Sequence, residues 1–316
     1  MPPAEPTLAG LPNPLLRYVV ATRPPFLSVT LVGCLLGLAV AHATGAAIDA
    51  TKAVVTVVFA LLAHAGANVI NDYYDALSGC DAANTDRLFP FTGGSRMIQN
   101  GVLTLPQTAR LGFGLFALVV PAGLWLAAAS APGLILIGLA GLLLGWAYSA
   151  PPLKLVSRGL GELVITASWL VVVCGADFVQ RGAFSWTPLL FGVPFALLVA
   201  NILFINQFPD VAADRVAGKR TLVVRAGPLE ARWFYLAIVA LAYGWMVVLM
   251  DRLRLPGAFG VAVVPVLMSL RAGRTLLLHA AEPAQLAPAL KLTIGSALAH
   301  GLLLCGALVA AGHALQ

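Results

Sequence analysis

Nine stretches of the sequence are long and apolar enough to cross a lipid bilayer, and they constrain the fold more than any other feature. A spanning helix needs about 20 mostly apolar residues, and its backbone polar groups must be satisfied within the segment. The sequence therefore predicts an all-α, polytopic membrane protein with nine transmembrane helices. The eighth stretch is the weakest, because it is short and interrupted by Pro265. The nine stretches are 26–44, 53–71, 108–129, 132–149, 163–180, 187–206, 232–250, 256–271 and 292–311.

The composition supports this class and argues against others. Of 316 residues, 60% are hydrophobic and 10% are charged, and the mean hydropathy is +0.91, far more apolar than a soluble domain requires. The net charge of +6 does not indicate nucleic-acid binding, because the basic residues flank the apolar stretches. The four cysteines are scattered without metal-ligand spacing.

The loops and basic residues predict the domain organisation and the orientation. We expect one helical domain at 26–311, a Pro-rich tail at 1–25, a short tail at 312–316, and cap loops at 72–107 and 207–231. Of the 19 basic residues, 15 fall on the side that holds the amino-terminal tail and both cap loops. Cytoplasmic loops carry an excess of Lys and Arg. The sequence therefore predicts a protein of the inner (cytoplasmic) membrane, with its amino terminus and both cap loops in the cytoplasm.

Two acidic clusters stand where the second and sixth stretches end. The first contains Asp72 and Asp75, followed by Asp81, and the second contains Asp210 and Asp214. Carboxylates at the mouth of a membrane span are costly unless they are used. Mg²⁺ prefers oxygen ligands and is usually held by one or two carboxylates plus substrate phosphates. We therefore interpret all five as candidate metal ligands for two ions, one held by Asp75 with Asp72 or Asp81 and one by Asp210 with Asp214.

Basic residues close to these clusters suggest what the metal would bind. A diphosphate bridging two ions needs further positive charge, which Arg and Lys side chains supply. Clamping a diphosphate attached to an allylic chain would stabilise the leaving group as the C–O bond ionises. The candidate diphosphate-binding residues are Arg96, Lys154, Arg158, Lys219 and Arg220.

Simpler explanations exist for several of these residues. One acidic cluster alone could be a solvated membrane surface, but two with the same spacing, each one turn after an Asn, favour a site. Lys154 and Arg158 could serve only to orient the chain in the membrane. Asp177 and Glu162 are typical of interfacial or helix-pairing residues. The five histidines show no ligand spacing and are interpreted as packing or surface groups.

Three ordered motifs resemble the UbiA superfamily of intramembrane prenyltransferases. The first motif, Asn-Asp-x-x-Asp, matches Asn71, Asp72 and Asp75, and the second matches Asn206, Asp210 and Asp214. The segment 148–162, YSAPPLKLVSRGLGE, resembles the segment that follows the fourth span in that family. The resemblance implies nine helices around a central cavity, two Mg²⁺ ions at its cytoplasmic mouth, and transfer of a polyprenyl group from a polyprenyl diphosphate to an aromatic acceptor.

Within the superfamily, the chain looks most like the branch that prenylates 1,4-dihydroxy-2-naphthoate in menaquinone biosynthesis. In NDYYDALSGCD, Gly79 stands where another branch has a third Asp, and the carboxylate moves to Asp81. Pro209, directly before Asp210, departs from the pattern and removes a backbone donor. Candidates to face the acceptor or the allylic cation are Asn68, Asn71, Tyr148, Ser149 and Asn206.

Three other functions remain open at this point. The acceptor could be 4-hydroxybenzoate or homogentisate, as in other quinone pathways. A CDP-alcohol phosphotransferase also places acidic residues and metal at a membrane mouth, but its compact motif is missing here. A cation-coupled transporter would place its carboxylates near the middle of the spans rather than at their ends.

Overall fold

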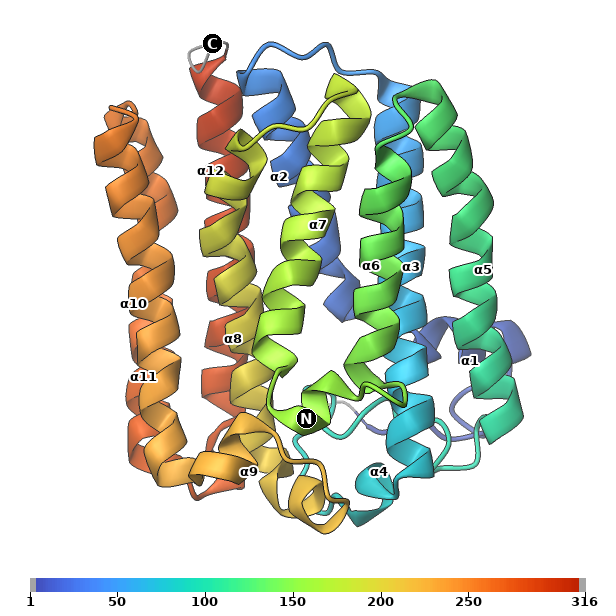
Figure 1. The fold of residues 1–316 in the computed structure, drawn as a ribbon. Coiled ribbons are helices and arrows are strands. Elements are labelled where there is room, and N and C mark those ends of the chain that lie inside the picture. The colour runs from blue at the N-terminus through green and yellow to red at the C-terminus, as the bar shows by residue number, and fades with distance from the viewer. Residues whose placement is uncertain (1–3, 313–316) are drawn as a thin grey trace.

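The computed structural model describes residues 4–312, and every regular element in that part of the chain is helical (Figure 1). Residues 1–3 of the predicted amino-terminal tail and 313–316 of the carboxyl-terminal tail lie outside the described residues. The long helices are α2 (Ser28–Ala43), α3 (Ala50–Leu77), α5 (Leu105–Ala129), α6 (Leu134–Ser149), α7 (Gly161–Arg181), α8 (Thr187–Val216), α10 (Pro228–Arg252), α11 (Val266–His279) and α12 (Ala287–Ala311). Short helices are α1 (Pro14–Ala21), η1 (Pro24–Leu27), α4 (Cys80–Ala83), η2 (Leu155–Arg158), α9 (Leu222–Ala226), η3 (Gly257–Val263) and η4 (Pro283–Gln285).

The predicted all-α membrane bundle is confirmed. Among the described residues, eight helical runs are long and apolar enough to cross a membrane, counting η1 with α2 and η3 with α11. The remaining predicted stretch, 132–149, is the fourth in the chain and forms the apolar helix α6, which at 16 residues is shorter than these eight runs. Each predicted stretch therefore has its helix, and the chain is an integral membrane protein.

Three helices run further than the apolar pattern indicates. The predicted second and sixth stretches end at 71 and 206, whereas α3 continues to Leu77 and α8 to Val216. Asp72, Asp75, Asp210 and Asp214 thus lie on the last turns of two helices, whereas Asp81 lies in the short helix α4 of the first cap loop. The eighth stretch is broken at Pro265, as its sequence indicates, but α11 then continues past 271 to His279. Hydrophobicity ends earlier than helicity because the final turns are amphipathic, with Arg271 and Arg274 exposed.

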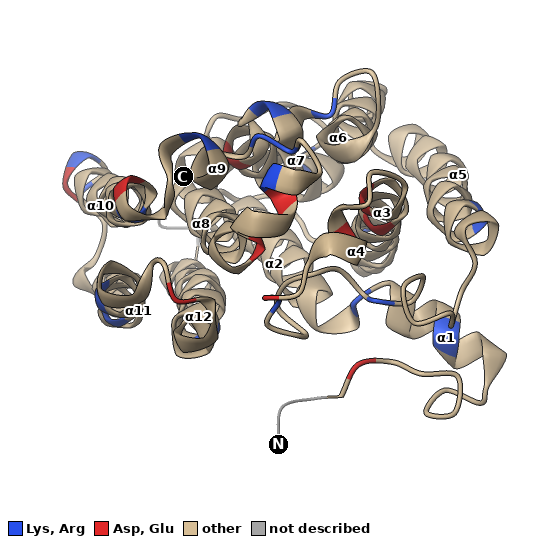
Figure 2. Cartoon of the chain, turned by 90° about the horizontal axis from the view of Figure 1, so that it is seen from below, with Lys and Arg blue, Asp and Glu red and all other residues tan. Residues whose placement is uncertain are grey.

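Helix α8 lies at the centre of the bundle and packs against α7, α10 and α12. Its phenylalanines are wholly buried and form much of the core, namely Phe191, Phe195, Phe204 and Phe208. Helix α7 in turn packs against α2 and α6, and α3 packs against α5. Figure 2 looks along the bundle at the end where α3 and α8 terminate, and acidic residues of α3, α4 and α8 lie at this end. The fold therefore brings two segments far apart in sequence to one end of the molecule.

Buried polar contacts join neighbouring helices, as interhelical hydrogen bonds do in membrane bundles. Asp177 forms an ion pair with Arg181 of the same helix, with 2.7 Å between Oδ1 and Nη2, and Arg181 also donates to the Thr44 hydroxyl after α2. Gln207 of α8 donates to the Glu162 carboxylate of α7. The helix-pairing interpretation of Asp177 and Glu162 agrees with these contacts.

We predict that Gly37→Ala lowers the melting temperature of the detergent-solubilised protein. Helix α2 approaches α7 so closely at Gly37 that an added Cβ would lie 2.2 Å from the Val173 carbonyl oxygen. Inserting an extra methyl group into such a tightly packed contact lowers the stability by roughly 1–3 kcal/mol. Gly114→Ala in α5 is the matched control, because a Cβ there meets open space. Equal melting temperatures for the two variants would contradict the close approach of α2 and α7.

Candidate active site

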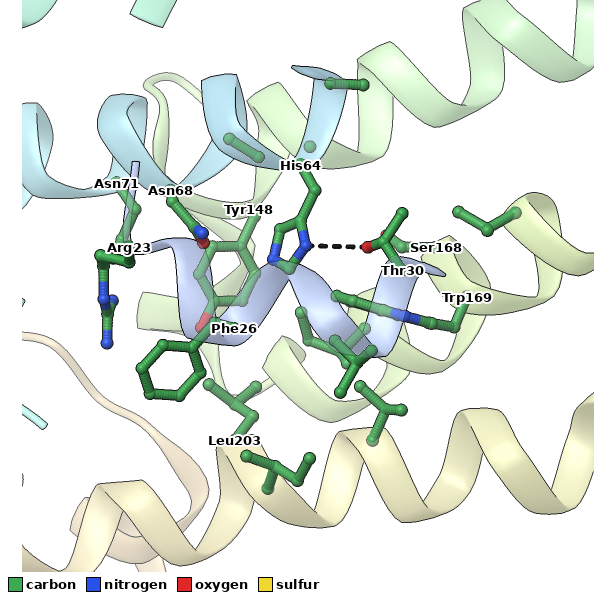
Figure 3. A pocket seen from close by; sticks show the side chains of 18 of the residues that line it. Arg23, Phe26, Thr30, His64, Asn68, Asn71, Tyr148, Ser168, Trp169 and Leu203 are labelled. Carbon is green, nitrogen blue, oxygen red and sulfur yellow. Dashed lines mark hydrogen bonds between the residues drawn. The ribbon is translucent and has the colours of Figure 1, made fainter. Parts of the chain in front are cut away.

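A cavity of about 390 Å³ opens inside the bundle next to the ends of α3 and α8. Its walls are mostly apolar and come from α2, α3, α6, α7 and α8, with η1 at one side. Figure 3 shows the spatial order of several polar side chains along the cavity: Asn71 and Arg23 lie at one end, Asn68 and Tyr148 come next, and His64 lies further in. Because Asn71 is adjacent to Asp72 in α3, the polar end of the cavity faces the acidic residues.

Asp72 and Asp81 converge on the backbone at Gly94. Both carboxylates are 4% exposed, and a Cβ at Gly94 would lie 3.0 Å from Asp72 Oδ1 and from Asp81 Oδ2. Gly94 has φ +72°, a conformation that suits glycine. The Ser95 amide donates to Asp72 Oδ2 at 3.1 Å, whereas Asp72 Oδ1 is buried without a hydrogen-bond partner. Unsatisfied buried carboxylate oxygens are costly, so this pair favours a positive ligand.

A lysine joins the two acidic clusters. Lys219 Nζ lies 2.9 Å from Asp75 Oδ2 of α3 and 3.7 Å from Asp214 Oδ1 of α8. Cys80 Sγ donates to the same Asp214 oxygen at 3.1 Å. The sequence analysis paired Asp75 with Asp72 or Asp81 and Asp210 with Asp214, whereas here Asp72 and Asp81 converge within the first cluster and Lys219 links Asp75 across the helices to Asp214. The two acidic helix ends are therefore adjacent and on the same side of the bundle.

Asp210 is held by a residue that the sequence analysis missed. Asn84 Nδ2 donates to Asp210 Oδ1 at 2.6 Å. The continuous helix α8 carries Pro209 inside it, just before Asp210. Asn84 follows α4 in the cap loop, and it has no periodic or motif signal, so only the folded loop reveals its role.

Four of the five candidate acceptor-facing residues line the cavity, and the fifth, Ser149, contacts Asn71 rather than lining it. Asn71 Nδ2 donates to Ser149 Oγ at 2.8 Å and to Asp75 Oδ2 at 3.1 Å, which links α3 to the end of α6. Asn68 Nδ2 donates to the Thr22 carbonyl oxygen at 3.1 Å. Tyr148 and Asn206 also line the cavity, and Asn206 Oδ1 is buried without a partner.

The five candidate phosphate-binding residues separate into two groups. Lys219 contacts the carboxylates directly, and the buried Arg96 donates from Nη1 to the Asp81 carbonyl oxygen. Three others are exposed: Lys154 directly before η2, Arg158 at the end of η2, and Arg220 on the loop after α8. Within residues 4–312, none of these three side chains pairs with a carboxylate, and Arg158 donates instead to the Pro152 carbonyl.

Two further cavity residues carry chemistry that the sequence analysis did not assign. Arg23 has φ 58°, and its guanidinium lies 4.6 Å from the Phe26 ring centroid at the cavity wall. His64 Nδ1 lies 2.8 Å from the Thr30 hydroxyl, and its ring meets Trp169 edge-on. A sequence signal existed for His64: it precedes Asn68 by one helical turn and so shares its face of α3.

The electrostatics of the loops reflect the crowding of carboxylates. Burial, and then the charges of Asp75 and Asp72, raise the pKa of Asp81 to about 8. Burial alone would lower the pKa of Lys219, but Asp75 and Asp214 outweigh it and raise that pKa well above its usual value. Lys219 therefore stays charged, and the acidic residues still outnumber the cations that contact them.

The donor set fits a hard divalent cation shared with a substrate. All donors from the five aspartates are oxygen atoms, the ligands that Mg²⁺ prefers. In the described part of the chain, no three or more His, Cys, Asp or Glu side chains gather closely enough to enclose an ion by themselves. The carboxylates stand in pairs instead, an arrangement that suits an ion completed by water and phosphate oxygens.

Comparisons with known proteins agree with this architecture. Residues 30–296 match the model of the UbiA prenyltransferase family. The chain is 32% identical over 258 residues to UbiA prenyltransferase domain-containing protein 1 of Xenopus tropicalis, covering 80% of this chain and 72% of the relative. It is 30% identical over 229 residues to 1,4-dihydroxy-2-naphthoate octaprenyltransferase of Mycobacterium tuberculosis, covering 72% of this chain and 75% of the relative.

Solved structures show the same fold at lower identity. A UbiA homolog from Aeropyrum pernix in its apo form superposes with a TM-score of 0.63 at 18% identity, covering 90% of this chain and 98% of the homolog. A UbiA homolog from Archaeoglobus fulgidus bound to GPP and Mg²⁺ gives a TM-score of 0.59 at 14% identity, covering 91% and 99%.

A helical membrane bundle with paired carboxylates at the mouth of an apolar cavity is the architecture of an intramembrane prenyltransferase. The chain belongs to the UbiA prenyltransferase family, as its motifs suggest. It is therefore an enzyme that transfers prenyl groups. Membership of this family favours a prenyltransferase over the CDP-alcohol phosphotransferase and the cation-coupled transporter.

We predict that Asp81 makes the stability of the chelator-treated protein depend on pH. Its pKa is raised from the usual 3.8 to about 8, so the protonated form is favoured by folding. This contribution is complete below about pH 4 and is lost as the pH rises towards 8. The melting temperature in EDTA should fall over this interval, and Asp81→Asn should flatten the fall. Asp86→Asn, which changes an exposed carboxylate in the same loop, should keep the wild-type slope; an unchanged slope in Asp81→Asn would contradict the assignment.

Proposed function

We propose that the protein transfers a polyprenyl group from a polyprenyl diphosphate to the ring of 1,4-dihydroxy-2-naphthoate, a step of menaquinone biosynthesis, with Mg²⁺ as cofactor. The observation that carries this proposal is the meeting of two acidic helix ends, on α3 and α8, at the polar end of an apolar cavity. Such a site separates a charged diphosphate from its hydrocarbon chain.

The acidic end would receive the diphosphate and two Mg²⁺ ions. Asp72, Asp75, Asp81, Asp210 and Asp214 are the proposed metal ligands and the catalytic groups. When bound, Mg²⁺ supplies positive charge that stabilises the diphosphate leaving group. Lys219 is already charged between the clusters and is placed to pair with a phosphate oxygen.

The other proposed phosphate contacts come from the surrounding loops. Arg96 lies behind Asp81. Lys154, Arg158 and Arg220 lie on two exposed loops, which a backbone hydrogen bond from Arg220 N to Ser157 O, 3.1 Å long, holds together. In this proposal they meet the outer phosphate and draw the anion towards the membrane surface.

The apolar cavities would take the prenyl chain. A second cavity of about 220 Å³ lies between α3, α5, α6 and α7. Both cavities share a border lined by Ala60, Ala63, Gly141, Leu142, Val171 and Val172. Two alanines and a glycine present small side chains at this border, so in this proposal an extended hydrocarbon would continue from the first cavity into the second.

The acceptor ring would lie at the polar end of the first cavity, facing Asn68, Asn71, Tyr148, Ser149 and Asn206. The π face of Tyr148 can stabilise the allylic cation. In the reaction, the bond between C1 of the prenyl group and the diphosphate oxygen breaks, and the ring carbon bonds to C1. The naphthoate carboxyl group leaves that carbon as CO₂, and its electron pair restores the aromatic ring.

Two of the similar proteins support these assignments. The Mycobacterium tuberculosis relative is named for an octaprenyl transfer to 1,4-dihydroxy-2-naphthoate, and the Archaeoglobus fulgidus structure holds GPP and Mg²⁺. The Xenopus tropicalis relative carries a name without an acceptor, so 4-hydroxybenzoate and homogentisate remain the alternatives. The distribution of Lys and Arg supports an inner-membrane location with the acidic end in the cytoplasm.

The proposal is tested by incubating the purified protein with Mg²⁺, a labelled prenyl diphosphate and each of the three acceptors, and identifying products by mass. We expect a prenylated naphthoquinol, with loss of CO₂, from dihydroxynaphthoate. EDTA should abolish product and Mg²⁺ should restore it. Asp210→Asn should reduce turnover at least 100-fold, because it removes a charge while keeping the side-chain shape. Product formation that resists chelation, or a preference for another acceptor, would refute the corresponding part of the proposal.

We further predict that Gly141→Val shifts the enzyme towards shorter prenyl diphosphates. A side chain at Gly141 enters the border between the two cavities, and its Cβ would contact Val171 at 3.4 Å, an ordinary packing distance. We expect the ratio of kcat/KM for a ten-carbon donor to that for a forty-carbon donor to rise about tenfold. A tenfold change corresponds to about 1.4 kcal/mol, which is the size of effect that a small change in an apolar pocket produces. Gly114→Val on α5, outside both cavities, is the control. An unchanged ratio would exclude the second cavity from the chain path.

A further inference from the structure

The described part of the amino-terminal segment, residues 4–13, lies against the cap loop that carries half of the acidic site. Leu11 and Tyr18 pack on a small core that contains Met97, Val102 and Leu103 of this loop. Arg17 donates to the Leu11 carbonyl oxygen at 2.8 Å, which fixes the segment to α1. A segment held in this way can present a side chain to the loop in a defined position.

That side chain is Glu5, whose carboxylate meets three groups of the cap loop. Its Oε1 lies 2.7 Å from Arg87 Nε, and its Oε2 accepts from Asn100 Nδ2 at 3.1 Å. Arg96 Nε lies 3.8 Å from the same Oε2. Asn100 also donates to the Pro6 carbonyl oxygen, so backbone and side chain of the segment are both engaged.

From Arg87 the contacts lead to the second acidic cluster. Arg87 Nη1 donates to the Asn84 carbonyl oxygen at 2.6 Å, and Asn84 in turn holds Asp210. The Arg87 side chain lies flat over Gly93, where an added Cβ would come within 2.8 Å of its Cβ and Cδ. Displacing Arg87 would therefore move the residue that holds Asp210.

From Arg96 the contacts lead to the first acidic cluster. Arg96 Nη1 donates to the Asp81 carbonyl oxygen, and Gln99 Nε2 donates to Asp81 Oδ2 at 3.2 Å. Ser95, next to Arg96, donates its amide to Asp72. Burial, and then repulsion by the nearby charge of Arg87, lower the pKa of Arg96. Glu5 is the carboxylate that contacts both.

We propose that Glu5 is a positioning residue for the acidic site: by joining Arg87 and Arg96 it fixes the cap loop so that Asp81 and Asp210 face the same ligand. This inference rests on the proposed function for the identity of that ligand. The alternative to a positioning role is an inhibitory contact, in which Glu5 competes with phosphate for Arg87 and Arg96. The two differ in sign, because loss of Glu5 weakens the enzyme in the first case and activates it in the second.

The test compares Glu5→Gln, Glu5→Asp and the control Asp86→Asn in the full-length protein purified in detergent. Glu5→Gln keeps the shape and removes the charge, while Asp86 is an exposed carboxylate of the same loop that has no ion pair within residues 4–312. Mn²⁺ binding, measured by electron paramagnetic resonance without substrate, should weaken at least fivefold in Glu5→Gln. Glu5→Asp should recover part of this loss, and Asp86→Asn should match the wild type.

Kinetics provide the second measurement. In Glu5→Gln the KM values for Mg²⁺ and for the prenyl diphosphate should rise severalfold, with a smaller change in kcat, because the ligand-binding geometry is loosened. A wild-type or higher Mn²⁺ affinity in Glu5→Gln overturns the inference. If the wild type binds Mn²⁺ but forms no prenylated product, the proposed function fails, while the binding comparison still decides the role of Glu5.

A double-mutant cycle tests the route through Arg87. If Glu5 acts by holding Arg87, then Arg87→Gln should weaken Mn²⁺ binding by a similar factor. The double variant should be no weaker than the more affected single variant, because contacting residues are not additive. A double variant whose loss equals the product of the two single losses would show that Glu5 and Arg87 act independently, and the proposed route would be wrong.

Discussion

The structure depends on keeping five carboxylates close together at the low-dielectric end of a membrane bundle. Like charges repel more strongly there than in water, and burying each one is costly. The chain meets this cost with contacts of several kinds: a shared lysine for Asp75 and Asp214, backbone amide and side-chain amide donors for the others. The carboxylates remain in excess, and in the proposed function that excess would attract a divalent cation and, through it, a diphosphate.

The positions of four of these carboxylates are set by the lengths of two helices. Helices α3 and α8 have 28 and 30 residues, more than a bilayer requires, and their last turns carry the acidic motifs. The rigid ends hold Asp72, Asp75, Asp210 and Asp214 at fixed spacing, whereas the loops only have to supply donors. The same two helices line the apolar cavity one or two turns deeper, so the position of the acidic end relative to the cavity is fixed by two continuous helices.

The sequence predicts the parts of the fold that depend on periodic or repeated patterns. Apolar runs locate the nine long helices, and the spacing of Asn71, Asp75, Asn206 and Asp210 locates the two acidic ends. It could not predict Asn84 or Glu5, whose contacts depend on the path of a loop that contains Arg96 and Gly94 in left-handed conformations. Nor could it show which basic residue turns inward. Composition treats Lys219 and Arg220 alike, yet the fold leaves the first half-buried among carboxylates and the second exposed to solvent.

The position of Lys219 also bears on how the protein is assembled during synthesis. The first acidic helix end, on α3, precedes α8 in the chain and is therefore synthesised first. Lys219 follows Asp214 by five residues, so the segment that brings the opposing negative charge also brings its counterion. The two acidic helix ends can thus meet through Lys219 with no metal bound, so joining the two halves of the chain does not require a cation.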